Sequence, residues 1–117
     1  MTLRLAREQC VACTGATAPL AEMEHAALLR QLARGWRVSD GHLLRTVPAA
    51  TFADAFTLAT RIALLAEAVG HHPTLTVEWG RVTIDCITHA IAALSRNDFR
   101  LAARIDELCA PGDNRHD

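Results

Sequence analysis

Six residues in the second half of the chain have side chains that could take part in chemistry on a small molecule. They are Glu67, His71, His72, Trp79, His89 and Asp98. His71 and His72 are adjacent in the stretch AEAVGHHPTL, where a glycine precedes them and a proline follows. A hydrophobic core rarely needs two neighbouring histidines. This pair is therefore the feature of the sequence that most needs an explanation.

Residue types and spacing leave three roles open for these histidines. A histidine in the last turn of a helix can bind the final carbonyls and complement the helix dipole, which would explain His71 or His72 but hardly both. Three histidines and a carboxylate are also zinc-ligand types. The spacing argues against zinc, because Gly70 is expected to break the helix between Glu67 and His71, and no HExxH pair is present.

The third role is acid–base catalysis without a metal. Imidazole has a pKa of about 6.5, so it can both donate and accept a proton at neutral pH. Two such groups on opposite sides of a small substrate would suit a dehydration or an isomerisation. The residues alone do not choose among the three roles.

The hydrophobic pattern predicts the first half of the framework that positions these residues. A helix is expected from Pro19 to Gly35, because apolar residues recur there at spacings of three and four. The stretch WRVSDGHLLRTV predicts two short strands around an Asp-Gly turn. A second helix is expected to begin at Thr51 and to end at Gly70 as a left-handed cap, with Pro73 preventing its continuation. The apolar stripe of this helix is predicted to contain Phe52, Phe56, Ala59, Ala63 and Ala66, widened by Ile62.

The second half of the framework is predicted to be a hairpin and a last helix. TLTVEW and RVTIDCIT alternate in hydrophobicity on either side of Gly80, and Trp79 is expected to share a face with Leu75 and Val77. HAIAALSR fits either a loop or a helical turn. The last helix is expected from about Asn97, as its N-cap, to about Cys109.

The element order is thus α-ββ-α-ββ-α, which predicts the α+β class. We expect a four-stranded antiparallel sheet with the helices packed on one face, and with the other face solvated or covered by a partner. At 117 residues the chain suffices for one domain. We assign residues 18–110 to this domain, residues 1–17 to an irregular N-terminal arm and residues 111–117 to a polar tail.

Composition excludes several function classes. With 12 basic and 13 acidic residues, the net charge of -1 provides neither the basic excess typical of nucleic-acid binding nor a polybasic membrane anchor. No apolar run approaches the roughly 20 residues of a membrane span, and charged residues occupy the N-terminus where a signal peptide would be apolar. We therefore expect a cytoplasmic protein with reduced cysteines. Cys10 and Cys13 form one CxxC motif without a second pair or a thioredoxin context, which is weak evidence for zinc.

The segment EAVGHHP, followed by Trp79, His89 and the block ALSRNDFRLAARID, resembles the pterin-4a-carbinolamine dehydratase family. The resemblance extends from about residue 19 to 109 and includes LARGWRV between the first helix and the first strand. It implies a hydro-lyase that converts 4a-hydroxytetrahydrobiopterin to quinonoid dihydropterin in tetrahydropterin recycling. It also implies a homodimer or homotetramer that needs no metal and no organic cofactor.

Carried over by position, the resemblance implies that His71 and His89 are the acid–base pair. His72 would mainly hold the pterin, and Glu67, Trp79 and Asp98 would shape and polarise the pocket. Relatives of this fold also serve as a dimerisation cofactor for a transcription factor and as an assembly chaperone for Rubisco, so a non-catalytic interaction protein is the alternative. Two positions depart from the family pattern, since Gly70 and Thr74 stand where acidic residues are common. Without an acid at position 70, Glu67 or Asp98 is left to orient a histidine.

Overall fold

The computed structural model describes residues 3–110 of the chain. Its elements, in chain order, are α1 (Leu3–Arg7), α2 (Glu22–Leu29), β1 (Arg37–Ser39), β2 (His42–Pro48), α3 (Phe52–Val69), β3 (Thr74–Glu78), β4 (Arg81–Cys86), the short 3-10 helix η1 (His89–Ile91) and α4 (Arg96–Cys109). The predicted polar tail at residues 111–117 lies outside the described residues. No helix in the described part of the chain has the length and apolar character needed to cross a membrane.

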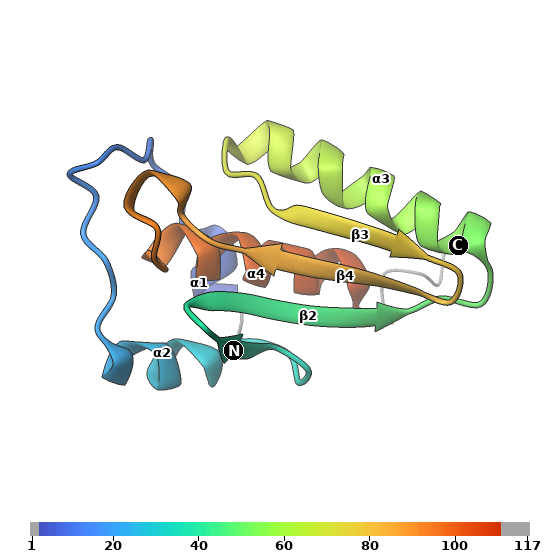
Figure 1. Ribbon diagram of the computed structural model, residues 1–117, viewed down its shortest axis with the longest axis horizontal. Helices are drawn as coiled ribbons and strands as arrows, with labels where there is room; N and C mark the ends of the chain where they lie inside the picture. The colour runs from blue at the N-terminus through green and yellow to red at the C-terminus, as the bar shows by residue number, and fades with distance from the viewer. Residues whose placement is uncertain (1–2, 111–117) are drawn as a thin grey trace.

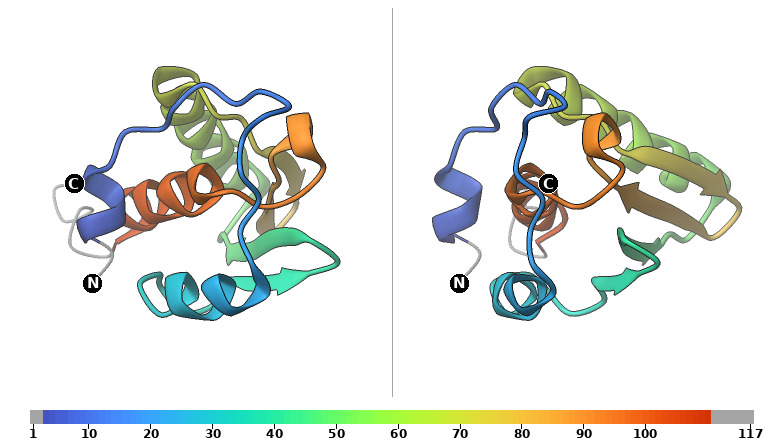
Figure 2. Two further views of the ribbon diagram at one scale, coloured as in Figure 1. Left: turned by 90° about the vertical axis from the view of Figure 1, so that its left-hand side faces the viewer. Right: turned by 60° about the vertical axis from the view of Figure 1, so that its left-hand side comes forward.

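The four strands form one antiparallel sheet in the order β1-β2-β4-β3. Side chains alternate across a strand, so Val82, Ile84 and Cys86 of β4 all point to the same face, where they are fully buried. The helices lie on this face of the sheet, and α4 runs between α2 and α3 (Figures 1 and 2). The predicted α+β class and the placement of helices on one face are confirmed.

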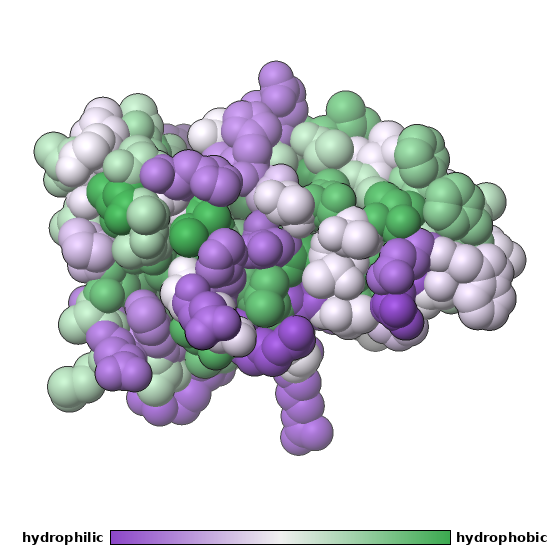
Figure 3. Space-filling model, in the orientation of Figure 1, coloured by the Kyte–Doolittle hydropathy of each residue, from purple (hydrophilic) through white to green (hydrophobic). Residues whose placement is uncertain are grey.

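The opposite face of the sheet is open. Its strands present mainly polar side chains there, such as Thr46, Thr76 and Thr83. Figure 3 looks onto this face and shows polar and intermediate side chains among scattered apolar ones. Among the described residues, no helix covers it (Figure 2).

The N-terminal region differs from the predicted irregular arm. Residues 3–7 form α1, and this helix lies on the side of α4 that faces away from the sheet (Figure 2). Leu5 is completely buried there. The Glu8 carboxylate then receives hydrogen bonds from Arg96 at 2.8 and 2.9 Å and from Arg100 at 2.8 Å. The arm is therefore part of the packed structure.

Helix α4 is consequently enclosed on two sides. Its buried residues are Asn97, Asp98, Phe99, Leu101, Ala102, Ala103, Ile105 and Asp106. The N-cap is Ser95, two residues before the predicted Asn97. Both are good N-cap types, but the side chain of Asn97 is used instead to bind the backbone of Val11.

Helix α3 begins and ends where the sequence predicted. Thr51 caps it by accepting a hydrogen bond from the Asp54 N–H at 3.0 Å, and Gly70 ends it at φ 77° in the left-handed region. The predicted apolar stripe was wrong in part, because Phe52 and Phe56 are 51% and 59% exposed. The residues that face the core are Ala55, Ala59, Ile62 and Ala66. Helix α2 is shorter than predicted and buries only Leu28.

Candidate active site

His71 stands where the chain leaves α3 and turns toward β3. The left-handed Gly70 ends the helix, so the following residue points inward and not along the helix axis. His71 is only 7% exposed. Its Nε2 lies 2.7 Å from Oδ1 of Asp98, which comes from the first turn of α4.

Asp98 is completely buried and fully hydrogen-bonded. Its second oxygen, Oδ2, accepts from the Ser95 backbone N–H at 2.9 Å and from the Thr88 hydroxyl at 2.7 Å. The Ser95 hydroxyl lies 2.7 Å from the same Thr88 oxygen. Such a saturated carboxylate offsets the cost of its own desolvation and cannot move without breaking several bonds.

The Asp98 contact determines which nitrogen of His71 is available for chemistry. A carboxylate that already accepts two other hydrogen bonds also acts as the acceptor toward Nε2, so Nε2 carries the hydrogen. In the neutral ring Nδ1 is then an acceptor, and it becomes a donor when the ring is protonated. One nitrogen can therefore serve as base or as acid.

A hollow of about 240 Å³ lies beside the His71 ring. Its lining residues are Cys13, Gly70, His71, His72, Ile87, Thr88, His89 and Ala90. They come from three places, namely the N-terminal segment, the turn after α3 and the turn after β4. All three predicted histidines line the same hollow, so the structure brings together the core of the predicted site.

His72 and His89 differ from His71 in their exposure. His89 begins η1 on the rim, and its residue is exposed. The ring of His72 is 60% exposed and lies 3.0 Å from Glu67 Oε1, whose side chain is 80% exposed. A solvent-exposed contact of this kind contributes little to stability, but it orients the ring. Asp98 and Glu67 thus each serve one histidine, which answers the question raised by Gly70.

Three of the six predicted residues do not line the hollow: Glu67, which contacts His72 from outside it, Asp98 and Trp79. Asp98 does not line it and is linked to it only through His71 and Thr88, so it is a positioning residue and not a substrate contact. Trp79 lies in the turn between β3 and β4 and is 74% exposed. Pro73 and the five residues of β3 separate it from the histidine pair, and the strand alone spans about 16 Å at roughly 3.3 Å per residue.

The sequence reasoning missed Thr88 and Cys13. Thr88 holds Asp98, and nothing distinguishes it in the sequence from other threonines near strand ends. Cys13 lies in the segment that was predicted to be an arm outside the domain. Its sulfur is 3.9 Å from Nδ1 of His71. The CxxC motif was the available signal, but no local pattern placed it next to a histidine 58 residues away.

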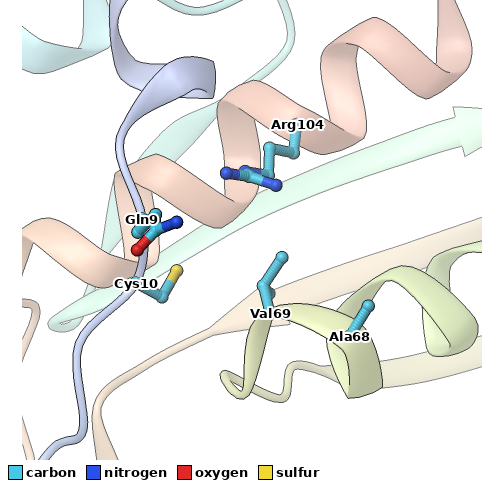
Figure 4. Close-up of a pocket in the computed structure, with 5 residues that line it drawn as sticks. All are labelled: Gln9, Cys10, Ala68, Val69 and Arg104. Carbon is cyan, nitrogen blue, oxygen red and sulfur yellow. The ribbon is translucent and has the colours of Figure 1, made fainter.

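A second hollow, of about 280 Å³, lies between the N-terminal segment, the end of α3 and α4 (Figure 4). It is lined by Gln9, Cys10, Ala68, Val69 and Arg104. None of these is a carboxylate or a histidine, so the larger hollow offers no acid–base pair near neutral pH. Within residues 3–110, no three His, Cys, Asp or Glu side chains are grouped so as to hold a metal ion.

Comparison with known proteins agrees with this geometry. Residues 18–108 match the model of the pterin 4 alpha carbinolamine dehydratase family. A protein of Chlorobium limicola is 46% identical over 103 residues, covering 85% of this chain and 90% of its own. One of Rubrobacter xylanophilus is 41% identical over 105 residues, covering 89% and 97%. Both are provisionally named pterin-4-alpha-carbinolamine dehydratases.

A solved structure shares the fold. The Brucella melitensis protein described as a transcriptional coactivator/pterin dehydratase superposes with a TM-score of 0.71 at 28% identity, over 78% of this chain and 98% of that one. Together with the family match, this similarity is sufficient for assignment. The chain belongs to the pterin 4 alpha carbinolamine dehydratase family.

Proposed function

We propose that this chain dehydrates a 4a-hydroxytetrahydropterin to the quinonoid dihydropterin, the hydro-lyase step of tetrahydropterin recycling. The observation that carries the proposal is the buried His71–Asp98 pair, in which the His71 nitrogen not bound to Asp98, Nδ1, lies beside Cys13 at the hollow shared with His72 and His89. The buried and fully hydrogen-bonded Asp98 fixes the His71 ring in one orientation. A protein that served only as a scaffold would gain nothing from aiming that pair at a hollow.

The reaction needs one proton delivered and one removed. The C4a–O bond breaks as the oxygen takes a proton and leaves as water, and the lone pair on the adjacent ring nitrogen forms the C=N bond. That nitrogen then loses its own proton. His71 and His89 serve these two positions, each contributing about 10²–10⁴-fold by positioned proton transfer. Neither a metal nor an organic cofactor enters this scheme.

His72 and Glu67 bind the substrate in this proposal and do not exchange protons with it. The His72 ring lines the hollow and is held by Glu67 at 3.0 Å. A hollow of about 240 Å³ is smaller than the roughly 300–1,000 Å³ of a typical ligand pocket. It therefore suits a single ring system such as a pterin.

The test is stopped-flow measurement of carbinolamine dehydration by His71→Ala and His89→Ala. We expect each variant to be slower by at least about 10²-fold. His42→Ala is the matched control, because His42 also pairs with a carboxylate, Asp85 at 2.6 Å, but on the open face of the sheet. Unchanged rates in both site variants would overturn the proposal, as would an equal loss in the control.

We also propose that the chain forms homo-oligomers. Phe52, Phe56 and Leu64 of α3 are 51%, 59% and 66% exposed. Phe52 and Phe56 are neighbours at i and i+4, and Leu64 lies about 120° around the helix from Phe52. Contiguous exposed apolar side chains are typical of association surfaces. The interaction-protein alternative would use such a surface too, and the Brucella protein is described by both roles.

A further inference from the structure

The hollow contains one side chain that the proposed dehydration does not use. Cys13 is half-buried, and its sulfur lies 3.9 Å from Nδ1 of His71. The other nitrogen of that ring lies 2.7 Å from Asp98. The thiol, the imidazole and the carboxylate thus form a chain. In catalytic triads the same chain lets a histidine, oriented by the acid, remove the proton of the nucleophile.

A second contact holds the Cys13 sulfur in place. The Asn97 side-chain amide donates to Cys13 Sγ at 3.0 Å. Its orientation is fixed, because Oδ1 accepts from the Val11 N–H at 3.1 Å and from Arg100 at 2.9 Å. The NH₂ group must therefore face the Val11 carbonyl and Cys13.

The thiol hydrogen of Cys13 has two acceptors within reach. One is Nδ1 of His71, and the other is the Val11 carbonyl at 3.8 Å. The Val11 carbonyl already accepts from Asn97 at 2.6 Å and cannot take up a proton. Of these two protein acceptors, only His71 can take up the proton.

Cys10 supplies a second thiol beside the first. Its sulfur lies 3.9 Å from the backbone carbonyl of Asn97, so both cysteines contact the same residue. Figure 4 shows Cys10 on the wall of the second hollow, from which solvent reaches it. Burial raises the pKa of the Cys10 thiol, against the opposing effect of Arg100 and Arg104. Cys10 therefore reacts as a thiol that must lose its proton when it attacks.

We propose that Cys13 is a reactive thiol whose substrate class is small hydroperoxides, with Cys10 as its resolving partner. Cys13 gives its proton to His71, and the thiolate attacks one peroxide oxygen. The S–O bond forms as the O–O bond breaks, and the departing oxygen leaves as water or alcohol with the proton from His71. Cys10 then attacks the Cys13 sulfenic acid, forming the disulfide and releasing water. The cysteine pair loses two electrons and the peroxide gains them.

Oxidation at Cys13 would also affect the neighbouring chemistry. A sulfenic oxygen or a disulfide at this position changes the group that faces Nδ1 of His71 inside the hollow. We therefore expect peroxide to slow the dehydration reversibly. This consequence rests on the proposed function, whereas the thiol chemistry does not.

The test is peptide mass spectrometry of the reduced full chain treated with hydrogen peroxide near pH 7. Trypsin leaves Cys10 and Cys13 on one peptide, from Glu8 to Arg30, whereas Cys86 and Cys109 fall on two others. We expect the first peptide to lose two hydrogens and to regain them with dithiothreitol. The peptide that carries the half-buried Cys109 is the control within the same sample. Equal oxidation of Cys109 and Cys13 in the wild type would overturn the proposal without any variant.

Three variants test the assigned roles. Cys10→Ser is expected to accumulate a sulfenic acid at Cys13 that dimedone traps, and Cys13→Ser to leave Cys10 unreacted. An ordinary thiol with a pKa of about 8.5 is only a few per cent ionised near pH 7, so His71→Gln is expected to slow Cys13 oxidation by about tenfold or more. An unchanged rate in a folded His71→Gln protein would refute the role of His71. Dehydration is measured on the reduced wild type, so its absence would sink the proposed function and leave the thiol result intact.

Discussion

Asp98→Asn is the sharpest perturbation of the candidate site, because it changes one atom of a fully described network. Oδ2 accepts from Thr88 and Ser95, so the asparagine must keep its oxygen at that position. The NH₂ group is then forced toward Nε2 of His71, at 2.7 Å in the native pair. Nε2 must become an acceptor, and the hydrogen of the neutral ring moves to Nδ1.

The magnitude follows from this inverted tautomer. In the neutral ring, Nδ1 now carries the hydrogen. The nitrogen that faces the hollow can therefore no longer accept a proton. Loss of one positioned acid–base group costs about 10²–10⁴-fold, and the same change in a serine-protease triad lies at the upper end of that range. Stability should fall by only about 1–3 kcal/mol, because the Thr88 and Ser95 bonds survive.

Two measurements check the prediction. Stopped-flow dehydration gives the rate, and long-range ¹H–¹⁵N spectra of the histidines report which nitrogen of His71 carries the hydrogen. Asp85→Asn is the matched control, because it makes the same change in the His42–Asp85 pair at 2.6 Å on the open face. An Asp98→Asn protein with the Asp85→Asn rate, or one whose spectra still show hydrogen on Nε2, would refute the reasoning.

Four further outcomes are expected. Hydrogen bonds from Arg96 lower the pKa of Glu8 from 4.5 to about 2 against opposing desolvation, and Arg100 also lowers it. This lowered pKa stabilises the fold above pH 4.5, and the contribution is lost as the pH falls toward 2. Glu8→Gln should therefore reduce the change with pH in the free energy of urea unfolding between pH 4.5 and pH 2. Gly70→Ala has open space for its Cβ but sits at φ 77°, and it should cost about 1 kcal/mol in thermal unfolding, with the left-handed strain as the sole cause. Trp79→Leu should leave the dehydration rate within about twofold, since a surface position away from the site rarely affects it; a large loss would place Trp79 in the site through another copy of the chain. Leu64→Glu should lower the mass measured by light scattering toward that of a single chain if α3 mediates self-association.

Sequence signals were reliable wherever a few neighbouring residues decide the structure. The Thr51 cap and the Gly70 stop were both predicted, because capping depends on hydrogen bonds within one turn. The hairpin around Gly80 and the buried side of β4 followed from simple alternation.

The errors arose where two local solutions were equally good. Helix α3 carries apolar residues on two sides, and periodicity cannot tell that Ile62 faces the core while Phe56 faces outward. Ser95 and Asn97 are both good caps for α4, and the choice depends on the Val11 backbone, which needs the Asn97 side chain. The arm was judged irregular because a five-residue helix has too little local stability to leave a pattern.

The residue types of the site, and the fold that carries them, were determined by the sequence itself. Three histidines, two carboxylates and a glycine stop are local facts; their spacing left three roles open, and the family resemblance favoured acid–base chemistry. Only the tertiary structure decided the partners, because Asp98 is 27 residues from His71 and Cys13 is 58 residues from it. Contacts at such separations depend on how whole elements pack, here α4 between the sheet and α1. Packing therefore made Asp98 an orienting group, left Trp79 outside and brought Cys13 in.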